Sequence, residues 1–403
     1  YLLLILFFKL DIIIKIVNMK TARIQLKTIK KQHKFINNID NTKKNNFKNR
    51  TIISVFVVIF YLVILCLTIL SDQTKSHWTS FDSKTSGIFA ILLVVVMYIP
   101  FVFAVLEATR LVFRTYEKIP IIILIVVSTI AYIIPALTLI FTNYFISHFF
   151  VQNDSTLDSE ETLNFYLYSK LTYTTIISSF ASWIILIIVL NIVLKVFYKA
   201  NFKNVITLNA LLMIIVFGFD GFIFISIFKG WTALLFLLIS VLATDAFCYV
   251  WGLFFGKHKM AKFISPNKTW EGAILGSVSS VALLMIYCGL LTLDNKVVYL
   301  NESRWLVTLK DIASFSTVYN YSLWIILLFV AIILVIFAIL GDLLFSYVKR
   351  AFAIKDFSNY LKSHGGFLDR VDSLLVVSLV FFIYSLIAIS VYSFVNFPTN
   401  ISV

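Results

Sequence analysis

Long apolar runs alternate with short polar segments along most of the 403-residue chain. A helix of about 20 apolar residues is long enough to cross the hydrocarbon core of a bilayer. Pro135 lies inside the third apolar run and is expected to bend it, because proline breaks the hydrogen-bond ladder of a helix. We therefore expect an all-α, polytopic integral membrane protein. The pattern predicts nine membrane-spanning helices: Ile52–Leu70, Gly87–Leu106, Ile119–Ile146, Thr172–Leu194, Val205–Phe228, Thr232–Leu253, Gly272–Leu293, Leu323–Phe345 and Ser373–Phe394.

The composition supports a membrane protein and excludes several kinds of site. Charged residues make up 13% of the chain, whereas soluble domains carry about a quarter. The three cysteines, Cys66, Cys248 and Cys288, lie singly in apolar runs, which favours small core residues over disulfides or metal ligands. The chain has no GxxxxGK[ST] or GxGxxG motif, so any nucleotide would have to be held by other groups.

The chain divides into three regions by composition. Residues 1–50 comprise an apolar leader broken by charges and a basic arm in which Asp40 is the one acidic residue. We expect residues 1–18 to be dispensable, with Met19 as the start, and the arm to lie near anionic lipid or to be a solvated cytoplasmic tail. Residues 51–230 are predicted to form N-terminal transmembrane helices. Residues 231–403 form a C-terminal transmembrane region that carries the polar motifs.

The distribution of positive charge predicts the orientation. If the basic arm is inside and every predicted helix crosses once, most of the 34 lysines and arginines fall on the inside. Cytoplasmic loops are enriched in these residues, so the pattern predicts N-in and C-out. Two polar segments, Gly256–Gly272 and Gly341–Ser373, would then lie on the same cytoplasmic side.

The later polar segment, Gly341–Ser373, carries three acids near the ends of predicted helices. Acids at membrane depth cost about 2.5 kcal/mol or more, so they are usually functional or paired. Asp369 and Asp372 are three residues apart and would share a helix face. Carboxylates bind hard cations such as magnesium, and basic side chains bind phosphate oxygens. The segment contains these acids and bases: Asp342, Asp369, Asp372, Lys349, Arg350, Lys355, Lys362 and Arg370.

Each of these features also has a simpler interpretation. Acids in the first turn of a helix are favoured by the helix dipole without any metal. Lys349 and Arg350 could be positive-inside anchors, His364 a hydrogen-bonded loop residue, and Gly365–Gly366 a tight turn. Their combination within about thirty residues makes a metal–polyphosphate site the favoured interpretation.

The earlier polar segment offers further phosphate ligands. Ser265 and Lys268 precede the seventh predicted helix, and helix N-termini with basic side chains are natural phosphate sites. Asp245, inside the sixth predicted helix, could line a polar cavity with Tyr249. Asp220 lies between glycines that would allow close helix–helix approach, and a helix–helix hydrogen bond is its simplest role.

The later segment resembles the signature of the phosphatidate cytidylyltransferase, or CDP-diacylglycerol synthase, family. The run FGKHKMAKFISPNKTWEG is similar to a second family motif, and the resemblance covers about a third of the chain. Lys362–Ser363 departs from the usual Pro-Gly before the histidine, and Cys248 replaces an alanine. The signature S-x-x-K-R, K-D, H-G-G-x-x-D-R-x-D is carried by Ser346, Lys349, Arg350, Lys355, Asp356, His364, Gly365, Gly366, Asp369, Arg370 and Asp372.

The resemblance implies a reaction and a set of roles. The family transfers a cytidylyl group from CTP to phosphatidate and releases pyrophosphate. Asp342 and Asp369 would bind Mg²⁺, with K⁺ as a further candidate ion. The implied phosphate-handling and catalytic residues are Lys349, Arg350, Lys355, Arg370 and Asp372. The implied substrate-binding residues are Ser265, Lys268, Ser346, His364, Gly365, Gly366 and Asp245.

The expected partners are CTP, phosphatidate and membrane lipid, with a homodimer as a candidate assembly and no nucleic acid. The expected location is the cell membrane, with the endoplasmic reticulum membrane as the alternative. A CTP-dependent polyprenol kinase, another lipid cytidylyltransferase and a transporter are the rival functions. The absence of matched Gly- or Pro-broken helices argues against the transporter.

Overall fold

A computed structural model describes residues 43–76, 83–111, 118–149, 160–193, 202–293, 321–358 and 365–396. The predicted leader, most of the basic arm, Lys362–Ser363 and His364 lie outside these described residues. Residues 43–58 belong to a separate compact unit, and the described residues from Ile59 onwards belong to the second.

The described residues are mainly helical, and each predicted apolar run falls on helix. A five-residue π-helix, Ile225–Lys229, joins α7 to α8, and the chain turns at Gly230, whose φ is +81°. The α-helices are α3 (Lys43–Ser76), α4 (Ser83–Arg110), α5 (Lys118–Phe149), α6 (Glu160–Val193), α7 (Phe202–Phe224), α8 (Gly230–Phe255), α9 (Trp270–Leu293), α12 (Tyr321–Ala351) and α13 (Leu368–Asn396).

Six of the helices in the described part of the chain are long and apolar enough to cross a membrane, namely α4, α7 with the π-helix, α8, α9, α12 and α13. Helices α3, α5 and α6 contain shorter apolar stretches, Val55–Ser71, Ile125–Thr138 and Ile177–Ile192. The prediction of an all-α membrane protein is therefore confirmed in its main feature. The total of nine spans and the orientation stay predictions.

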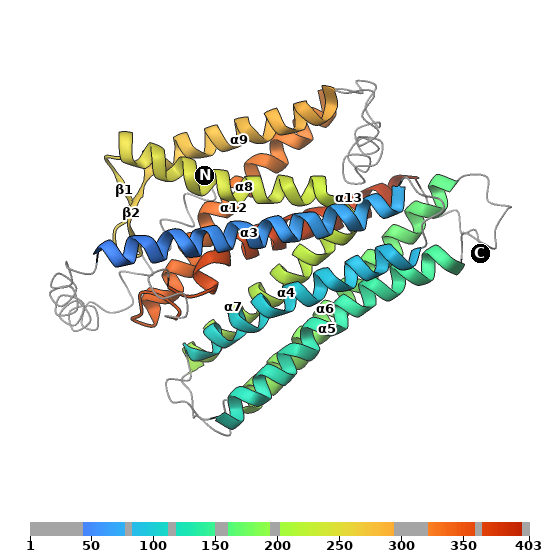
Figure 1. The fold of residues 1–403 in the computed structure, drawn as a ribbon, viewed down its shortest axis with the longest axis horizontal. Coiled ribbons are helices and arrows are strands. Elements are labelled where there is room, and N and C mark those ends of the chain that lie inside the picture. The colour runs from blue at the N-terminus through green and yellow to red at the C-terminus, as the bar shows by residue number, and fades with distance from the viewer. Residues whose placement is uncertain are drawn as a thin grey trace. The chain divides into compact units, whose positions relative to one another are not determined.

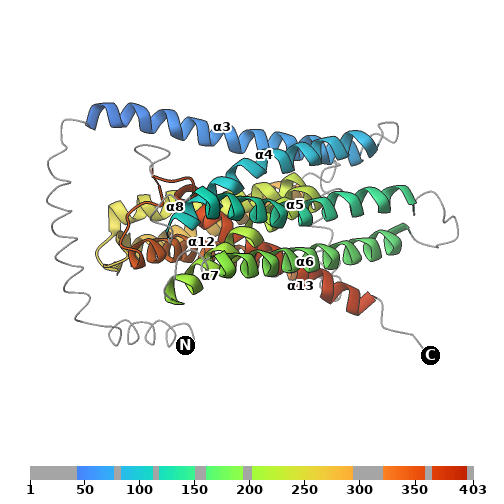
Figure 2. The same cartoon turned by 90° about the horizontal axis from the view of Figure 1, so that it is seen from below.

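Two short strands interrupt the helical pattern, which the sequence analysis did not anticipate. Strand β1 (Lys259–Ala261) pairs antiparallel with β2 (Ser265–Thr269), with Lys259 opposite Thr269. The hairpin connects α8 to α9, which run side by side in Figure 1, and Figure 2 gives the same ribbon from below. Ser265 and Lys268 therefore lie on a strand rather than in a loop.

Glycines allow α8 and α9 to approach each other closely. A Cβ on Gly272 would lie 2.8 Å from the Gly252 Cα, and a Cβ on Gly276 would lie 2.6 Å from the Cys248 Sγ. Small residues at such crossings let helix backbones meet, which is a main source of helix association in a bilayer. The contact fixes the end of α8 and the start of α9, and so positions the hairpin between them.

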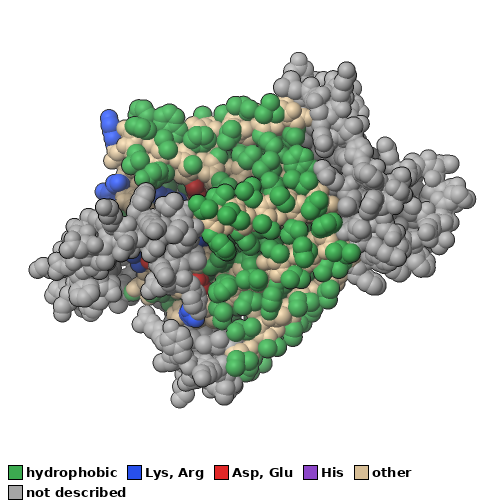
Figure 3. All heavy atoms as spheres, in the orientation of Figure 1, with side chains coloured by type: hydrophobic (Ala, Val, Ile, Leu, Met, Phe, Trp, Pro, Cys, Tyr) green, Lys and Arg blue, Asp and Glu red, His purple; other side chains and the backbone are tan. Residues whose placement is uncertain are grey.

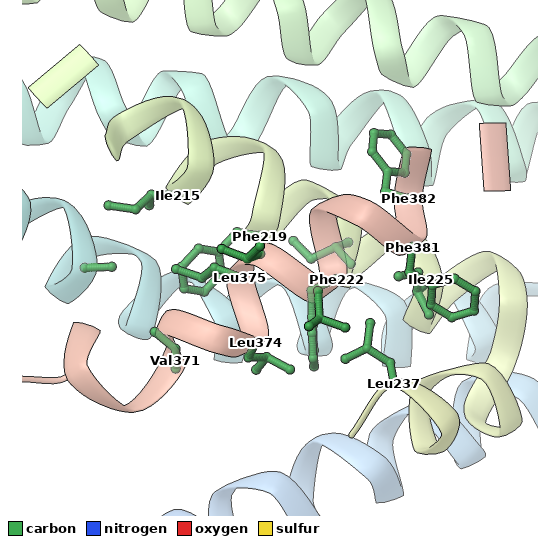
Figure 4. Packing of buried hydrophobic residues seen from close by; sticks show 14 of the residues in the cluster. Ile215, Phe219, Phe222, Ile225, Leu237, Val371, Leu374, Leu375, Phe381 and Phe382 are labelled. Carbon is green, nitrogen blue, oxygen red and sulfur yellow. The ribbon is translucent and has the colours of Figure 1, made fainter. Parts of the chain in front are cut away.

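Helix α13 packs against α7 in the same manner. A Cβ on Gly218 would lie 2.8 Å from the Leu375 carbonyl oxygen, and the Ser378 hydroxyl donates to the Gly218 carbonyl at 2.7 Å. Phe219 of α7 and Leu375 of α13 lie together in the core shown in Figure 4. The prediction that glycines around Asp220 permit close helix approach is confirmed. Asp220 itself is buried, and its Oδ2 accepts no hydrogen bond from the described residues.

The outward faces of the helices carry many exposed apolar side chains. On the face shown in Figure 3, hydrophobic side chains cover most of the described surface, and acidic and basic side chains gather at one end. Leu253, Ile274 and Ile325 are each more than half exposed. A large continuous apolar surface of this kind is typical of contact with lipid.

We expect Gly221→Ala to destabilise the protein, because its new Cβ would lie 2.9 Å from the Ser378 carbonyl oxygen and from the Phe382 Cβ. Overpacking of this kind costs about 1–3 kcal/mol. The measurement is the thermal unfolding midpoint in detergent. Gly289→Ala is the matched control, because the nearest atom, on Trp324, would be 3.9 Å away. Equal unfolding midpoints for the two variants would contradict the close α7–α13 contact.

Candidate active site

The two polar segments predicted to share one side of the membrane contact each other directly. The Lys268 Nζ on β2 lies 2.6 Å from the Asp342 Oδ2 on α12. The Arg350 Nε donates to the Ile264 carbonyl oxygen at 3.3 Å, in the turn of the hairpin. The hairpin is thereby joined to the last turns of α12.

Asp342 is a carboxylate of this contact region that keeps unused hydrogen-bonding capacity. Its Oδ2 accepts from Lys268, and its Oδ1 accepts from the Ser346 hydroxyl, one turn further along α12, at 3.3 Å. The side chains of Lys268 and Asp342 are 24% and 32% exposed, so both remain accessible to a ligand. A carboxylate can accept about four hydrogen bonds, and two of these are occupied here.

Asp369, in the first turn of α13, is more deeply buried and more fully bonded. The Lys349 Nζ lies 2.7 Å from its Oδ1, and the two side chains are 12% and 7% exposed. The backbone N–H groups of Phe357 and Gly366 donate to its Oδ2 at 3.1 and 2.8 Å. The bond to Gly366 resembles the reciprocal half of a capping box, in which an acid reaches back to an N–H just before the helix.

The two glycines before α13 are required by neighbouring carboxylates as well as by the turn. Gly365 has a φ of +80°, and a Cβ there would lie 2.9 Å from the Asp369 Oδ2. A Cβ on Gly366 would lie 2.5 Å from the Glu107 Oε2. A tight turn alone would not explain why both positions lack a side chain.

Glu107, in the last turn of α4, is part of this region and was not predicted from the sequence. It is fully buried, and its carboxylate accepts the backbone N–H groups of Phe367 at 2.8 Å and Leu368 at 2.7 Å. The Ser358 hydroxyl also donates to it. Glu107 directly follows the predicted apolar run Gly87–Leu106, where an unpaired acid is costly, and that cost was the available signal that it needs a partner.

Two further acids interact with Asp342. The charge of Asp342 acts on Asp372 of α13 and on Asp245 of α8. The positive charge of Lys349 offsets this repulsion at Asp372, and that of Lys268 offsets it at Asp245. Lys349 thus pairs with Asp369 directly, and its positive charge also acts on Asp372, the acid three residues further along the same helix.

The remaining predicted residues lie around this core. Arg350 donates to two backbone carbonyls, Ile264 and Ile354, and so acts on the geometry of the hairpin and the loop. Lys355 and Arg370 are exposed, and Ser265 is partly buried on β2. Tyr249 is 69% exposed on α8, near the same end. His364 lies outside the described residues.

Magnesium fits the donor set that the sequence analysis assigned to it. Asp342 has unused acceptor capacity on both oxygens, and Asp369 has it on Oδ1. Magnesium commonly takes one or two protein carboxylates and completes its six ligands with water and substrate phosphate. Among the described residues no three His, Cys, Asp or Glu side chains form a metal-sized group, so an all-protein cage is not the expected kind of site. The assignment of Asp342 and Asp369 as ligands stays a prediction.

Comparison with known proteins identifies a family. A model of the cytidylyltransferase family matches residues 88–388. A putative phosphatidate cytidylyltransferase of Mycoplasma pneumoniae is 40% identical over 187 residues, which cover 42% of this chain and 47% of that protein. The phosphatidate cytidylyltransferase of Staphylococcus saprophyticus is 35% identical over 149 residues, covering 37% of this chain and 47% of that protein. That of Rickettsia conorii is 30% identical over 205 residues, covering 50% and 79% respectively.

The family resemblance seen in the motif is confirmed by these matches. For the first two relatives the matched region spans about half of the relative's length. The family model extends well beyond the C-terminal motifs, from α4 into α13. It therefore includes Glu107 together with both polar segments.

Proposed function

The chain belongs to the cytidylyltransferase family, and on that premise we propose that it transfers a cytidylyl group from CTP to phosphatidate. The products are CDP-diacylglycerol, a phospholipid precursor, and pyrophosphate. The observation that carries the proposal is the cluster in which Lys268–Asp342 and Lys349–Asp369 lie at one end of an apolar helix bundle. A nucleotide from water and a lipid from the bilayer can both reach such a place.

The basic side chains supply the means of binding two phosphorylated substrates. An ammonium group has three donors, and in the described part of the chain Lys268 and Lys349 each direct one of them to a carboxylate. Phosphate oxygens can therefore bind beside the carboxylates without complete loss of the ion pairs. Lys355 and Arg370 add exposed positive charge at the loop and at the start of α13. Ser265 and Lys268 bring donors from the hairpin.

The proposed reaction is an in-line displacement at phosphorus. An oxygen of the phosphatidate phosphate forms a bond to the α-phosphorus of CTP, and the bond from that phosphorus to the bridging oxygen of the β-phosphate breaks. The electron pair leaves with pyrophosphate. The protein's contribution is positioning and charge stabilisation, because phosphoryl-type transfers need little covalent help.

We assign Asp342 and Asp369 as the carboxylates that would hold magnesium. When bound, the ion neutralises charge on the phosphate oxygens. Asp342 would present its accessible oxygens to it, and Asp369 would be kept in place by Lys349 and two backbone amides. Potassium stays a candidate second ion, and a homodimer a candidate assembly.

Purified protein in lipid nanodiscs is expected to convert CTP and phosphatidate to CDP-diacylglycerol, with one pyrophosphate released for each lipid product. The measurement is labelled liponucleotide by chromatography together with pyrophosphate release. Reactions lacking phosphatidate, or with a polyprenol in its place, are the controls. A phosphorylated alcohol with CDP release would instead indicate a polyprenol kinase. Absence of any CTP-dependent product from well-folded protein would refute the proposal.

Asp342→Asn and Asp369→Asn are each expected to lower turnover by about 100-fold or more, because losses of preorganised charge stabilisation are of this size. The fold-loss of turnover in the double variant should be smaller than the product of the two single fold-losses, since both acids would act on the same metal–phosphate unit. Turnover is measured across a magnesium titration, with the unfolding midpoint recorded in parallel. Near-normal turnover by a well-folded variant would remove that residue from the metal assignment. A dipole role alone would give a small stability loss for Asp369→Asn and little change in turnover.

We further propose that the site faces the cytoplasm, with the N-terminus inside, the C-terminus outside and nine spans in the cell membrane. The ends of α4, α8 and α12 and the start of α13 meet at one place, which agrees with alternate crossings. In a cysteine-free background, an impermeant thiol reagent applied to intact cells should label a cysteine at Ser159 and not one at Ser363. The reverse pattern would overturn the orientation.

A further inference from the structure

We propose that Glu107 is a positioning residue of the transfer reaction. It holds the two described ends of the loop before α13, residues 357–358 and 365–367, and through them the Lys349–Asp369 pair. This inference rests on the proposed function. Glu107 lies in the last turn of α4, outside both polar segments that carry the family signature. Its carboxylate accepts three hydrogen bonds from residues on both sides of the loop, which indicates a role beyond packing.

Within the described part of the chain, the hydrogen bonds of the Glu107 side chain go to Ser358, on one side of the loop, and to Phe367 and Leu368 at the start of α13. The Oε1 accepts from the Phe367 N–H at 2.8 Å and from the Ser358 hydroxyl, and the Oε2 accepts from the Leu368 N–H at 2.7 Å. The side chain is fully buried. Ser358 and Phe367 stand at the two sides of the loop, so one carboxylate ties both of its described ends.

A carboxylate suits this place better than any neutral side chain. The first N–H groups of a helix have no partner within the helix, and the helix dipole favours negative charge there. Glutamate offers acceptors on both oxygens, whereas glutamine offers one acceptor oxygen and an NH₂ group that can only donate. A buried acid without these bonds would be strongly unfavourable, so the loop and Glu107 stabilise each other's placement.

Glu107 and Asp369 together bind successive backbone groups. Asp369 accepts the Gly366 N–H, and Glu107 accepts the next two, those of Phe367 and Leu368. Movement of Phe367 therefore moves Gly366 relative to Asp369. Since Asp369 also pairs with Lys349 at 2.7 Å, the displacement reaches two proposed reaction groups. A misplacement of about 1 Å can cost about 100-fold in rate.

Gly366 shows how closely the carboxylate and the loop fit. Any side chain at this position would meet the Glu107 carboxylate, with a Cβ at 2.5 Å from Oε2 and 2.9 Å from both Cδ and Oε1. The three atoms nearest to such a Cβ all belong to Glu107, so the Glu107 carboxylate is what requires a glycine at position 366. This gives a second site at which the same geometry can be disturbed.

The first experiment compares Glu107→Gln with wild type in nanodiscs. We expect kcat for CDP-diacylglycerol formation to fall at least 10-fold per folded molecule, with smaller changes in KM for CTP and phosphatidate. Backbone amide exchange at Phe367 and Leu368 should be faster, because their acceptor is impaired. Thr109→Ala is the matched control on α4, since its buried hydroxyl donates at 3.0 Å to the Leu106 carbonyl of its own helix and not to the residues before α13 that the structure describes. It should leave kcat and loop exchange unchanged.

The second experiment is a double-mutant cycle between Glu107 and Gly366. Gly366→Ala alone should lower kcat, because its methyl group displaces the Glu107 carboxylate. In a Glu107→Ala background that clash is removed, so the added loss should be clearly smaller. If Glu107→Gln does not fold, Ser358→Ala tests the same contact, because it removes one donor and keeps the carboxylate. It should raise loop exchange and lower kcat in the same direction.

The outcomes separate this inference from the proposed function. Wild-type protein without CDP-diacylglycerol synthesis would refute the function. An active wild type with a Glu107→Gln variant that has normal kcat and normal loop exchange would refute the positioning role, whatever the change in unfolding midpoint. Losses that multiply fully in the Glu107–Gly366 cycle would also refute it.

Discussion

The geometry of this site depends on one constraint: carboxylates at the end of an apolar helix bundle must find charged or hydrogen-bonding partners. Asp369 is paired with Lys349 and accepts two backbone N–H groups. Glu107 accepts two further backbone N–H groups and the Ser358 hydroxyl. Each acid lies on one element and most of its partners lie on another. Satisfying the charges therefore joins α4, α12 and α13 at one end, and Asp342 adds the hairpin through Lys268.

The same pairing prepares the site for the proposed chemistry. A lysine held by a carboxylate is already oriented, so less side-chain entropy is lost when a phosphate binds beside it. The two pairs differ in exposure, with Lys268–Asp342 more open than Lys349–Asp369. On the proposed function, the more exposed Lys268–Asp342 pair is suited to give up its ion pair for contacts to substrate phosphate or metal during binding. The buried pair is suited to hold its geometry while the phosphorus–oxygen bonds change.

The sequence was informative where a local rule applies. Apolar length predicted the helices, and the spacing of Asp369 and Asp372 predicted that both would share a face at the start of one helix, which is α13. It failed where contacts join distant segments, as for Glu107 and Leu368, which are 261 residues apart. The β1–β2 hairpin was also missed, because residues 259–269 show no regular alternation and their pairing depends on the close α8–α9 contact. The sequence also could not decide whether Gly365–Gly366 is only a tight turn or part of a functional motif, because the Glu107 contact at Gly366 comes from a distant segment.

Helix α13 connects the site to the rest of the bundle, because it is fixed at two levels. Its first turn is held by Glu107 and Asp369, and its middle is held where Gly218 and Gly221 of α7 meet it. In a bilayer, close backbone contact is a principal source of helix association, since lipid is as apolar as the side chains. The α7–α13 contact therefore sets the axis of α13, and the carboxylates set its rotation and starting point. Asp369 and Asp372 occupy defined positions only when both conditions hold. The candidate site at the end of the bundle thus takes its precision from glycine contacts within the apolar part of the bundle.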